Sequence, residues 1–121
     1  MLVTKLHYHS VSKVLDVHFD NDTVAQFSAE MLRVLSPSAE VQQHGNPILV
    51  ANKKDVGIVK ISPVGHYAAR LIFDDGHNTG LYSWEFFANL AKHKEQLWAA
   101  YLENVKRHNA TRDALIPIKI K

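Results

Sequence analysis

Short stretches in which apolar and polar residues alternate are the feature that most restricts the fold of this chain. The alternation runs through KLHYHS and KVLDVHF, continues through TVAQF, and returns in GIVKISPVGHYAARLIF. A strand places successive side chains on opposite sides of a sheet, so this period of two predicts half-buried strands. The connectors SVS, DNDT, PVG and DDGHNTG are rich in turn-forming residues. Antiparallel strands joined by hairpins are therefore expected.

Two serines mark the expected starts of helices. Ser28 precedes AEMLRVL, a short helix that Pro37 must end, because the residue before a proline disfavours helical geometry. Ser83 precedes a longer stretch whose apolar residues recur near every 3.6 positions. This pattern predicts an amphipathic C-terminal helical region and leaves open a break near His93. After the first helix, residues 38–55 are mostly polar and predict a loop, with an interruption left open at the apolar stretch ILV, residues 48–50.

The expected fold is therefore α+β, with one small antiparallel β-sheet, a short helix after the first strands and the amphipathic C-terminal helical region packed on the sheet. A chain of 121 residues can bury one core, so we expect a single domain over residues 1–110. Residues 111–121 are expected to form a C-terminal tail, whose end LIPIKIK is extended or frayed. No signal-peptide core or long apolar run is visible, which favours a cytoplasmic protein.

Charge and cysteine content exclude several classes of function. Lysine and arginine number 14 and aspartate and glutamate 12, spread along the chain, which gives a net charge of +2 and no basic stripe for nucleic acid. The chain has no cysteine, so it cannot form disulfides, thiolate zinc sites, a cysteine nucleophile or a thiolate-held iron–sulfur cluster. Any metal ion would need aspartate, glutamate or some of the eight histidines. Neither a membrane nor a nucleic acid is an expected partner.

Two histidine patterns in the sequence are candidates for metal sites. His18 and Asp20 form H-x-D, two thirds of the triad that binds iron in non-haem oxygenases, but the strands are too few for the barrel that such a site requires. A strand that ends in a turn is the favoured interpretation. His7 and His9 form H-x-H, which places both rings on one face of a strand, as metal ligands sometimes are. Solvent-facing strand histidines explain the same pattern.

The stretch LRVLSPSAEV places two serines on either side of a proline. A serine nucleophile would be expected in a frame such as G-x-S-x-G, which Ser36 and Ser38 lack. Their hydroxyls are better explained as hydrogen-bonding partners of the local backbone around Pro37.

Three linked motifs carry a resemblance to a known family. LRVLSPSAEV, PVGHYA and FDDGHNTGLYSW occur in this order, and the chain over roughly residues 5 to 92 resembles the gamma-butyrobetaine hydroxylase-like N-terminal domain family. In the eukaryotic hydroxylases this domain is similar to a zinc module in which L-R-x-x-C-P-C-x-x-C and a later histidine hold the metal. The resemblance assigns those four positions here to Ser36, Ser38, Val41 and His77. Zinc ligation by this set is not expected, because hydroxyls bind zinc poorly and valine cannot bind it.

The resemblance also sets expectations about function. Relatives occur alone, ahead of a 2-oxoglutarate-dependent hydroxylase domain, or fused to Mrp-type iron–sulfur carrier ATPases. This implies a non-catalytic accessory or protein-interaction module without cofactor, with a link to iron–sulfur cluster maturation and an Mrp-type ATPase as the candidate partner. The alternatives are a histidine-based metal-binding domain and an accessory domain of a 2-oxoglutarate-dependent hydroxylase system. The residues expected at the interaction surface are Arg33, His44, His66, Tyr67, His77 and Tyr82.

Overall fold

Six strands and three helices make up the part of the chain that the structure, a computed structural model, describes: residues 1–43 and 47–114. The strands are β1 (Val3–His9), β2 (Val14–Phe19), β3 (Val24–Ser28), β4 (Ile58–Val64), β5 (Ala68–Phe73) and β6 (Leu81–Ser83). The helices are α1 (Ala29–Val34), α2 (Ala39–Gln42) and α3 (Trp84–Arg107). The predicted α+β class is confirmed.

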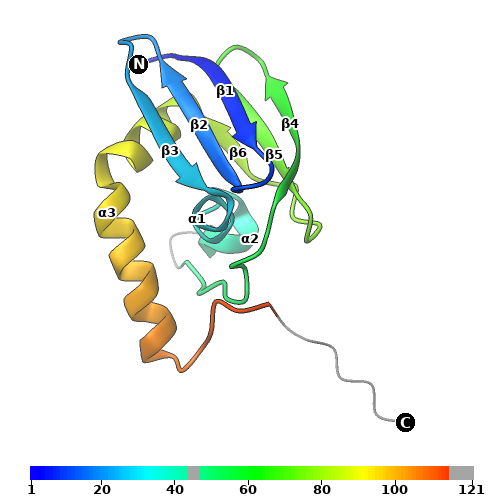
Figure 1. Ribbon diagram of the computed structural model, residues 1–121, viewed down its shortest axis with the longest axis vertical. Coiled ribbons are helices and arrows are strands. Elements are labelled where there is room, and N and C mark those ends of the chain that lie inside the picture. Colours follow the sequence, from blue (N-terminus) through cyan, green and yellow to red (C-terminus); the bar gives the residue numbers. More distant parts are fainter. Residues whose placement is uncertain (44–46, 115–121) are drawn as a thin grey trace.

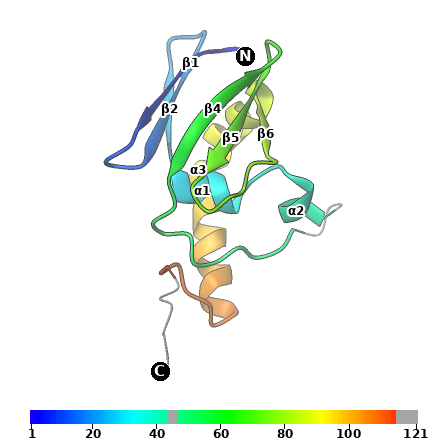
Figure 2. The same ribbon diagram turned by 90° about the vertical axis from the view of Figure 1, so that its right-hand side faces the viewer.

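The strands form two antiparallel sheets, ordered β1-β2-β3 and β4-β5-β6. Both orders follow the chain, as the hairpin connectors predict. The two sheets lie side by side, with α1 below the ends of the strands (Figures 1 and 2). A hydrogen bond links the first sheet to the second: the Ile58 N–H donates to the Tyr8 hydroxyl at 3.1 Å. The strands predicted as one sheet thus divide into two.

The core lies between the inner faces of the two sheets and the helices. Alternate residues of β2, β3, β5 and β6 point into it and meet residues of α1 and α3. The members with 1 % or less of their surface exposed include Leu15, Val17, Phe27, Leu32, Leu71, Phe73, Tyr82 and Phe87. Burial of each large apolar side chain stabilises the fold by about 1.5–3 kcal/mol. The period-two pattern in the sequence therefore corresponds to a core that both sheets share.

Both predicted helix starts are confirmed. The Ser28 hydroxyl accepts a hydrogen bond from the Met31 N–H at 3.1 Å, and the Ser83 hydroxyl accepts one from the Phe86 N–H at 3.0 Å. α1 ends before Pro37, also as expected. α3 runs through His93 without a break and extends beyond the ends of the strands (Figure 1). Among the described helices, none combines the length and apolar character needed to cross a membrane.

The connection between α1 and β4 differs from the predicted loop. It contains the short helix α2, which begins directly after Ser38. Four residues are too few for a hydrophobic period to show in the sequence.

The segment after α3 returns to the domain. Thr111 and Arg112 accept backbone hydrogen bonds from Asn52 and Lys54, both at 2.9 Å. Arg112 also forms an ion pair with Glu30 of α1. Residues 111–113, which the sequence assigns to the C-terminal tail, therefore contact the domain. The end LIPIKIK lies outside the described residues.

Candidate functional site

The four positions that the zinc-module resemblance singles out converge in space. Ser36 and Ser38 lie between α1 and α2, Val41 lies in α2, and His77 lies in the loop between β5 and β6. His77 Nε2 is 2.9 Å from Ser36 Oγ and 3.4 Å from Ser38 Oγ. All four residues are buried, with no more than 6 % of their surface exposed. We refer to Ser36, Ser38, Val41 and His77 as the serine–histidine cluster.

Local hydrogen bonds shape the serine side of this cluster. The Ser38 N–H donates to Ser36 Oγ at 3.3 Å, which closes a turn across Pro37. The Gln42 side-chain amide donates to the Ser36 carbonyl at 2.8 Å and ties α2 to the same turn. Val41 is an apolar side chain at the third of these positions, and only 3 % of its surface is exposed. The expected backbone bond is thus present for Ser36, whereas the Ser38 hydroxyl contacts His77.

A triangle of charges holds the loop that carries His77. Asp75 Oδ2 accepts from Arg33 Nε at 2.8 Å and from Lys53 Nζ at 2.7 Å, and its Oδ1 accepts from the His77 N–H at 3.1 Å. Burial opposes ionisation of Asp75, but the hydrogen bonds from Lys53, His77 and Arg33 outweigh it and lower its pKa to about 2. Asp75 is therefore a carboxylate at neutral pH, and it fixes the backbone at His77.

His77 is a neutral imidazole at pH 7. Burial lowers its pKa, the nearby Arg33 charge acts in the same direction, and the opposing carboxylates of Glu40 and Asp75 do not restore it. Its Nδ1 lies 3.3 Å from Glu40 Oε2, which can only accept, so Nδ1 carries the proton. Nε2 is then an acceptor, and the Ser36 hydroxyl donates to it. His77 is therefore a buried, hydrogen-bonded group and not the exposed residue that the expected interaction surface requires.

The order Ser36, His77, Glu40 resembles the serine, histidine and carboxylate of a hydrolase triad. A nucleophile must meet its substrate, however, and Ser36 has 0 % of its surface exposed. The hydroxyl also serves as acceptor for the Ser38 N–H. The arrangement therefore supports a structural cross-link between two loops rather than acyl transfer at Ser36.

The same donor set does not fit zinc. Two neutral hydroxyls, one valine and one imidazole replace the thiolates and histidine that hold a structural zinc ion. One effective ligand remains, and it already has hydrogen-bonding partners on both ring nitrogens. Hydrogen bonds and packing occupy the place of a metal here.

Gly80 and Tyr82 close the cluster from the β6 side. A Cβ atom on Gly80 would lie 2.6 Å from Ser36 Oγ and 2.9 Å from Tyr82 Cε1, so only glycine fits this close approach. The Tyr82 hydroxyl donates to the Leu32 carbonyl, and the side chain is fully buried. Burial, more than any charge nearby, raises the Tyr82 pKa.

Three of the six residues expected at the interaction surface have little or no exposed side chain. Tyr82 and His77 are buried, and the Arg33 side chain is only 12 % exposed because it points to Asp75. His66 and Tyr67 do lie on the surface, in the turn between β4 and β5, and Tyr67 is 68 % exposed. His44 lies outside the described residues.

The oxygenase-like pair His18 and Asp20 gains no third ligand. His18 lies opposite Lys5 in the register of β1 and β2, and Asp20 lies in the turn after β2. In the described ranges, neither belongs to a group of three side chains close enough to share a metal ion. A strand end followed by a turn, the favoured interpretation, accounts for both residues.

Sequence reasoning missed a second surface, the outer face of the sheet β4-β5-β6. The alternation of KISPV and ARLIF puts one set of side chains in the core and the other outside, but only the observed packing shows which set is outside. A shallow hollow on this face is lined by Lys60, Ser62, Arg70, Ile72, Asn78, Thr79 and Leu81. Its two charged residues, Lys60 and Arg70, are both cationic.

Comparison with known proteins gives a consistent family relationship. A family model described as gamma-butyrobetaine hydroxylase-like, N-terminal, matches residues 6–88. A search of curated proteins found no match.

Solved structures similar to this chain cover most of its length. Two solution NMR structures, whose descriptions give no function, have 48 % and 42 % sequence identity and a TM-score of 0.82 each. The alignments cover 99 % and 98 % of this chain and 91 % and 96 % of those chains. A crystal structure of a protein of unknown function from Acidithiobacillus ferrooxidans, in the DUF971 family, has 32 % identity and a TM-score of 0.63, covering 74 % of this chain and 92 % of that one.

Proposed function

Since the chain belongs to the gamma-butyrobetaine hydroxylase-like N-terminal family, we propose that it acts as a non-catalytic protein-interaction module that binds its partner through the outer face of the sheet β4-β5-β6. The observation that carries this proposal is the cross-strand pair of Arg70 and Leu81 on that face. Leu81 is 44 % exposed, and Arg70 is exposed beside it. Facing residues on adjacent antiparallel strands present one joint surface.

The chemistry of this face supports a protein partner with an acidic rim. Arginine and aromatic residues are enriched at the centres of protein interfaces. Lys60 and Arg70 form no ion pair with a carboxylate within residues 1–43 and 47–114. Both cations are therefore available to a partner's acidic groups, which would guide association and make it sensitive to salt.

An Mrp-type iron–sulfur carrier ATPase is the partner that we propose to test first. The support comes from the family resemblance, in which such ATPases are fused to related domains, and not from a residue of this chain. The chain has no cysteine with which to hold a cluster, so its part would be to position the carrier. A cytoplasmic location goes with this role. The competing role is that of an accessory domain in a 2-oxoglutarate-dependent hydroxylase system.

Affinity capture from the native cell, followed by titration with the purified partner, tests the proposal. We expect Leu81→Ala and Arg70→Ala each to cost about 2 kcal/mol of binding free energy, roughly 30-fold in Kd. Tyr67→Ala tests in the same way whether the interface includes the β4–β5 turn. Val11→Ala is the matched control, because Val11 is an exposed apolar residue in the turn between β1 and β2.

The outcomes distinguish an error in the proposed partner from an error in the proposed binding face. Capture of a hydroxylase in place of an Mrp-type ATPase would refute the iron–sulfur role and leave the interaction module intact. If Leu81→Ala and Arg70→Ala bind a captured partner as tightly as Val11→Ala does, the proposed face is wrong.

A further inference from the structure

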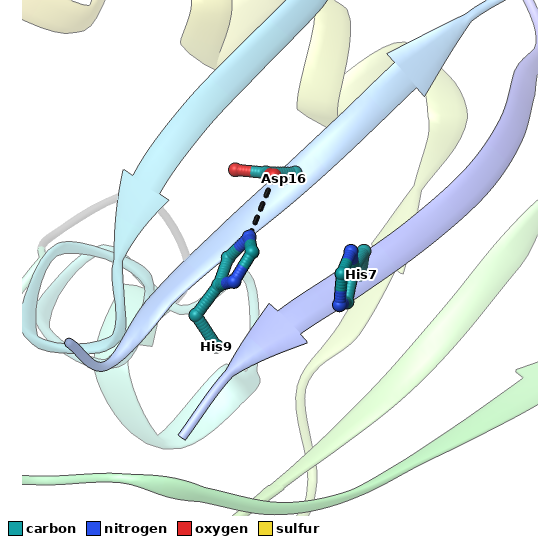
Figure 3. Close-up of side chains that lie close together, drawn as sticks. All are labelled: His7, His9 and Asp16. Atoms are coloured by element: carbon teal, nitrogen blue, oxygen red, sulfur yellow. Dashed lines mark hydrogen bonds and ion pairs between the residues drawn. The ribbon is translucent and has the colours of Figure 1, made fainter. Parts of the chain in front are cut away.

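A cluster of possible metal ligands lies on the outer face of the other sheet, far in sequence from the serine–histidine cluster. His7 and His9 of β1 and Asp16 of β2 each offer a ligand atom, and these three atoms lie within 4.8 Å of one another. Figure 3 shows both imidazole rings and the carboxylate on the same side of the two strands. The register explains this arrangement, since His7 pairs directly with Asp16 and His9 follows two residues later.

From this geometry we infer that His7, His9 and Asp16 form a binding site for a divalent transition-metal ion of the zinc class, with one coordination position left open. Two imidazoles and one carboxylate are a donor set that suits Zn²⁺ and Ni²⁺. Three protein ligands leave the fourth tetrahedral position for water or for a group from another molecule.

The contact between His9 and Asp16 requires only a small side-chain movement to admit an ion. Zinc bonds to nitrogen and oxygen are about 2.1 Å long, so two ligands of one tetrahedral ion lie about 3.4 Å apart. His9 Nε2 and Asp16 Oδ2 are now 2.7 Å apart and joined by a hydrogen bond. The His7 and His9 ring centroids are 4.3 Å apart. An ion would replace the shared proton, and the His9 and Asp16 atoms would separate by less than an ångström.

The surroundings prepare the carboxylate for this role. Gln26 of β3 donates to Asp16 Oδ1 at 2.9 Å, which leaves Oδ2 directed at His9. Such an outer hydrogen bond orients a ligand before the metal arrives.

The site is also accessible. The His9 side chain is 41 % exposed, and His7 is exposed on the strand at the edge of its sheet. An ion can therefore enter without any opening of the fold, and a second molecule can reach its open position. The inference is independent of the partner surface proposed above, which lies on the other sheet.

Calorimetric titration of Zn²⁺ and Ni²⁺ into the full chain, without an affinity tag and freed of metal, tests the inference. We expect one ion per chain and a Kd that rises at least about tenfold in His7→Ala and in Asp16→Asn. The matched control is His18→Ala, because His18 lies on β2 two residues from Asp16 and outside the cluster. Its Kd should change by less than about twofold.

Nitrogen-15 NMR of the histidine side chains gives a readout that needs no variant. Addition of Zn²⁺ should shift the ring nitrogens of His7 and His9 and leave those of His18 and His66 in place. Binding without a defined stoichiometry, equal weakening by His18→Ala and His7→Ala, or equal shifts of all histidines would overturn the inference.

Discussion

Arg112 donates hydrogen bonds to both carboxylate oxygens of Glu30, a residue 82 positions earlier in the chain, at 2.8 and 2.7 Å. Glu30 is 5 % exposed, and the Tyr101 hydroxyl donates to the same carboxylate at 2.9 Å. This bidentate contact is a strong type of side-chain ion pair, because the two N–H groups of the guanidinium match the two oxygens of the carboxylate. It joins α1, α3 and the segment after α3.

Removing this guanidinium should destabilise the protein. Arg112→Ala leaves the buried Glu30 carboxylate without its cation, and we expect the free energy of unfolding to fall by about 2–3 kcal/mol. Urea denaturation measures the loss. Arg107→Ala is the control, since Arg107 is an exposed cation near the end of α3 and should change stability by less than about 0.5 kcal/mol. Equal losses in both variants would show that the Glu30 contact contributes little.

The neutral state of His77 should make stability depend on pH. In the unfolded chain histidine binds its proton near pH 6.5, whereas the folded pKa of His77 is lower. The unfolded state therefore binds more protons below pH 6.5, and stability should fall as the pH drops from 6.5 towards 5 by at most about 1.4 kcal/mol per unit.

Urea denaturation between pH 7.5 and 5 measures this slope. His77→Gln should remove most of it, while His66→Gln, which changes an exposed histidine, should keep it. A slope that survives in His77→Gln would assign it to another group. Asp75 does not interfere above pH 5, because its pKa of about 2 makes its contribution fall only between about pH 4 and 2.

Gly80 should tolerate no side chain. In Gly80→Ala the added methyl group would collide with Ser36 Oγ and Tyr82 Cε1, and the buried positions of both residues leave no room for them to move away. We expect a loss of about 1–3 kcal/mol in the free energy of unfolding. Asn78→Ala, an exposed change in the same loop, should stay within about 0.5 kcal/mol of the parent protein. Equal stability of the two variants would contradict the close approach at Gly80.

The serine–histidine cluster should become a zinc site when cysteines are introduced at its three other positions. Cysteine at positions 36, 38 and 41 together, with His77 retained, should bind one Zn²⁺ more than the parent protein does and raise the thermal midpoint, because three thiolates and an imidazole complete the tetrahedron. Val41→Cys alone should not bind at this cluster. Zinc content after gel filtration and calorimetric melting measure both effects.

The parent protein provides the control for that experiment. Because hydrogen bonds hold its turn, a chelator should leave its thermal midpoint unchanged. A fall in the midpoint on addition of chelator would mean that a metal ion contributes to the native fold.

Local sequence patterns predict where the helices and strands of this fold lie better than they predict which of their residues are buried. Ser28 and Ser83 identified the two main helix starts, because capping depends on residues within one turn. The interaction surface expected from the family motifs includes Tyr82, and the alternation in a three-residue strand does not show which face is buried. It also includes His77, which follows the turn-forming residues Asp74, Asp75 and Gly76. The burial of His77 depends on Ser36, 41 positions away, and so on tertiary packing.

The ion pair between Arg112 and Glu30 could not be predicted from the sequence either, because it also depends on tertiary packing. An arginine near a terminus and a glutamate in a short helix are ordinary surface residues, and only the fold brings them together. The converging positions Ser36, Ser38, Val41 and His77, by contrast, could be found through the family motifs.

The hydroxyl cross-link between Ser36 and His77 also determines how the domain responds to oxidants. Thiolates that hold zinc react with peroxide, pass through sulfenic acid and release their metal, so a zinc-held turn opens under oxidative stress. Serine does not enter that chemistry, and this chain has no cysteine anywhere. The turn across Pro37 should therefore keep its shape in peroxide concentrations at which a thiolate-bound relative would lose it.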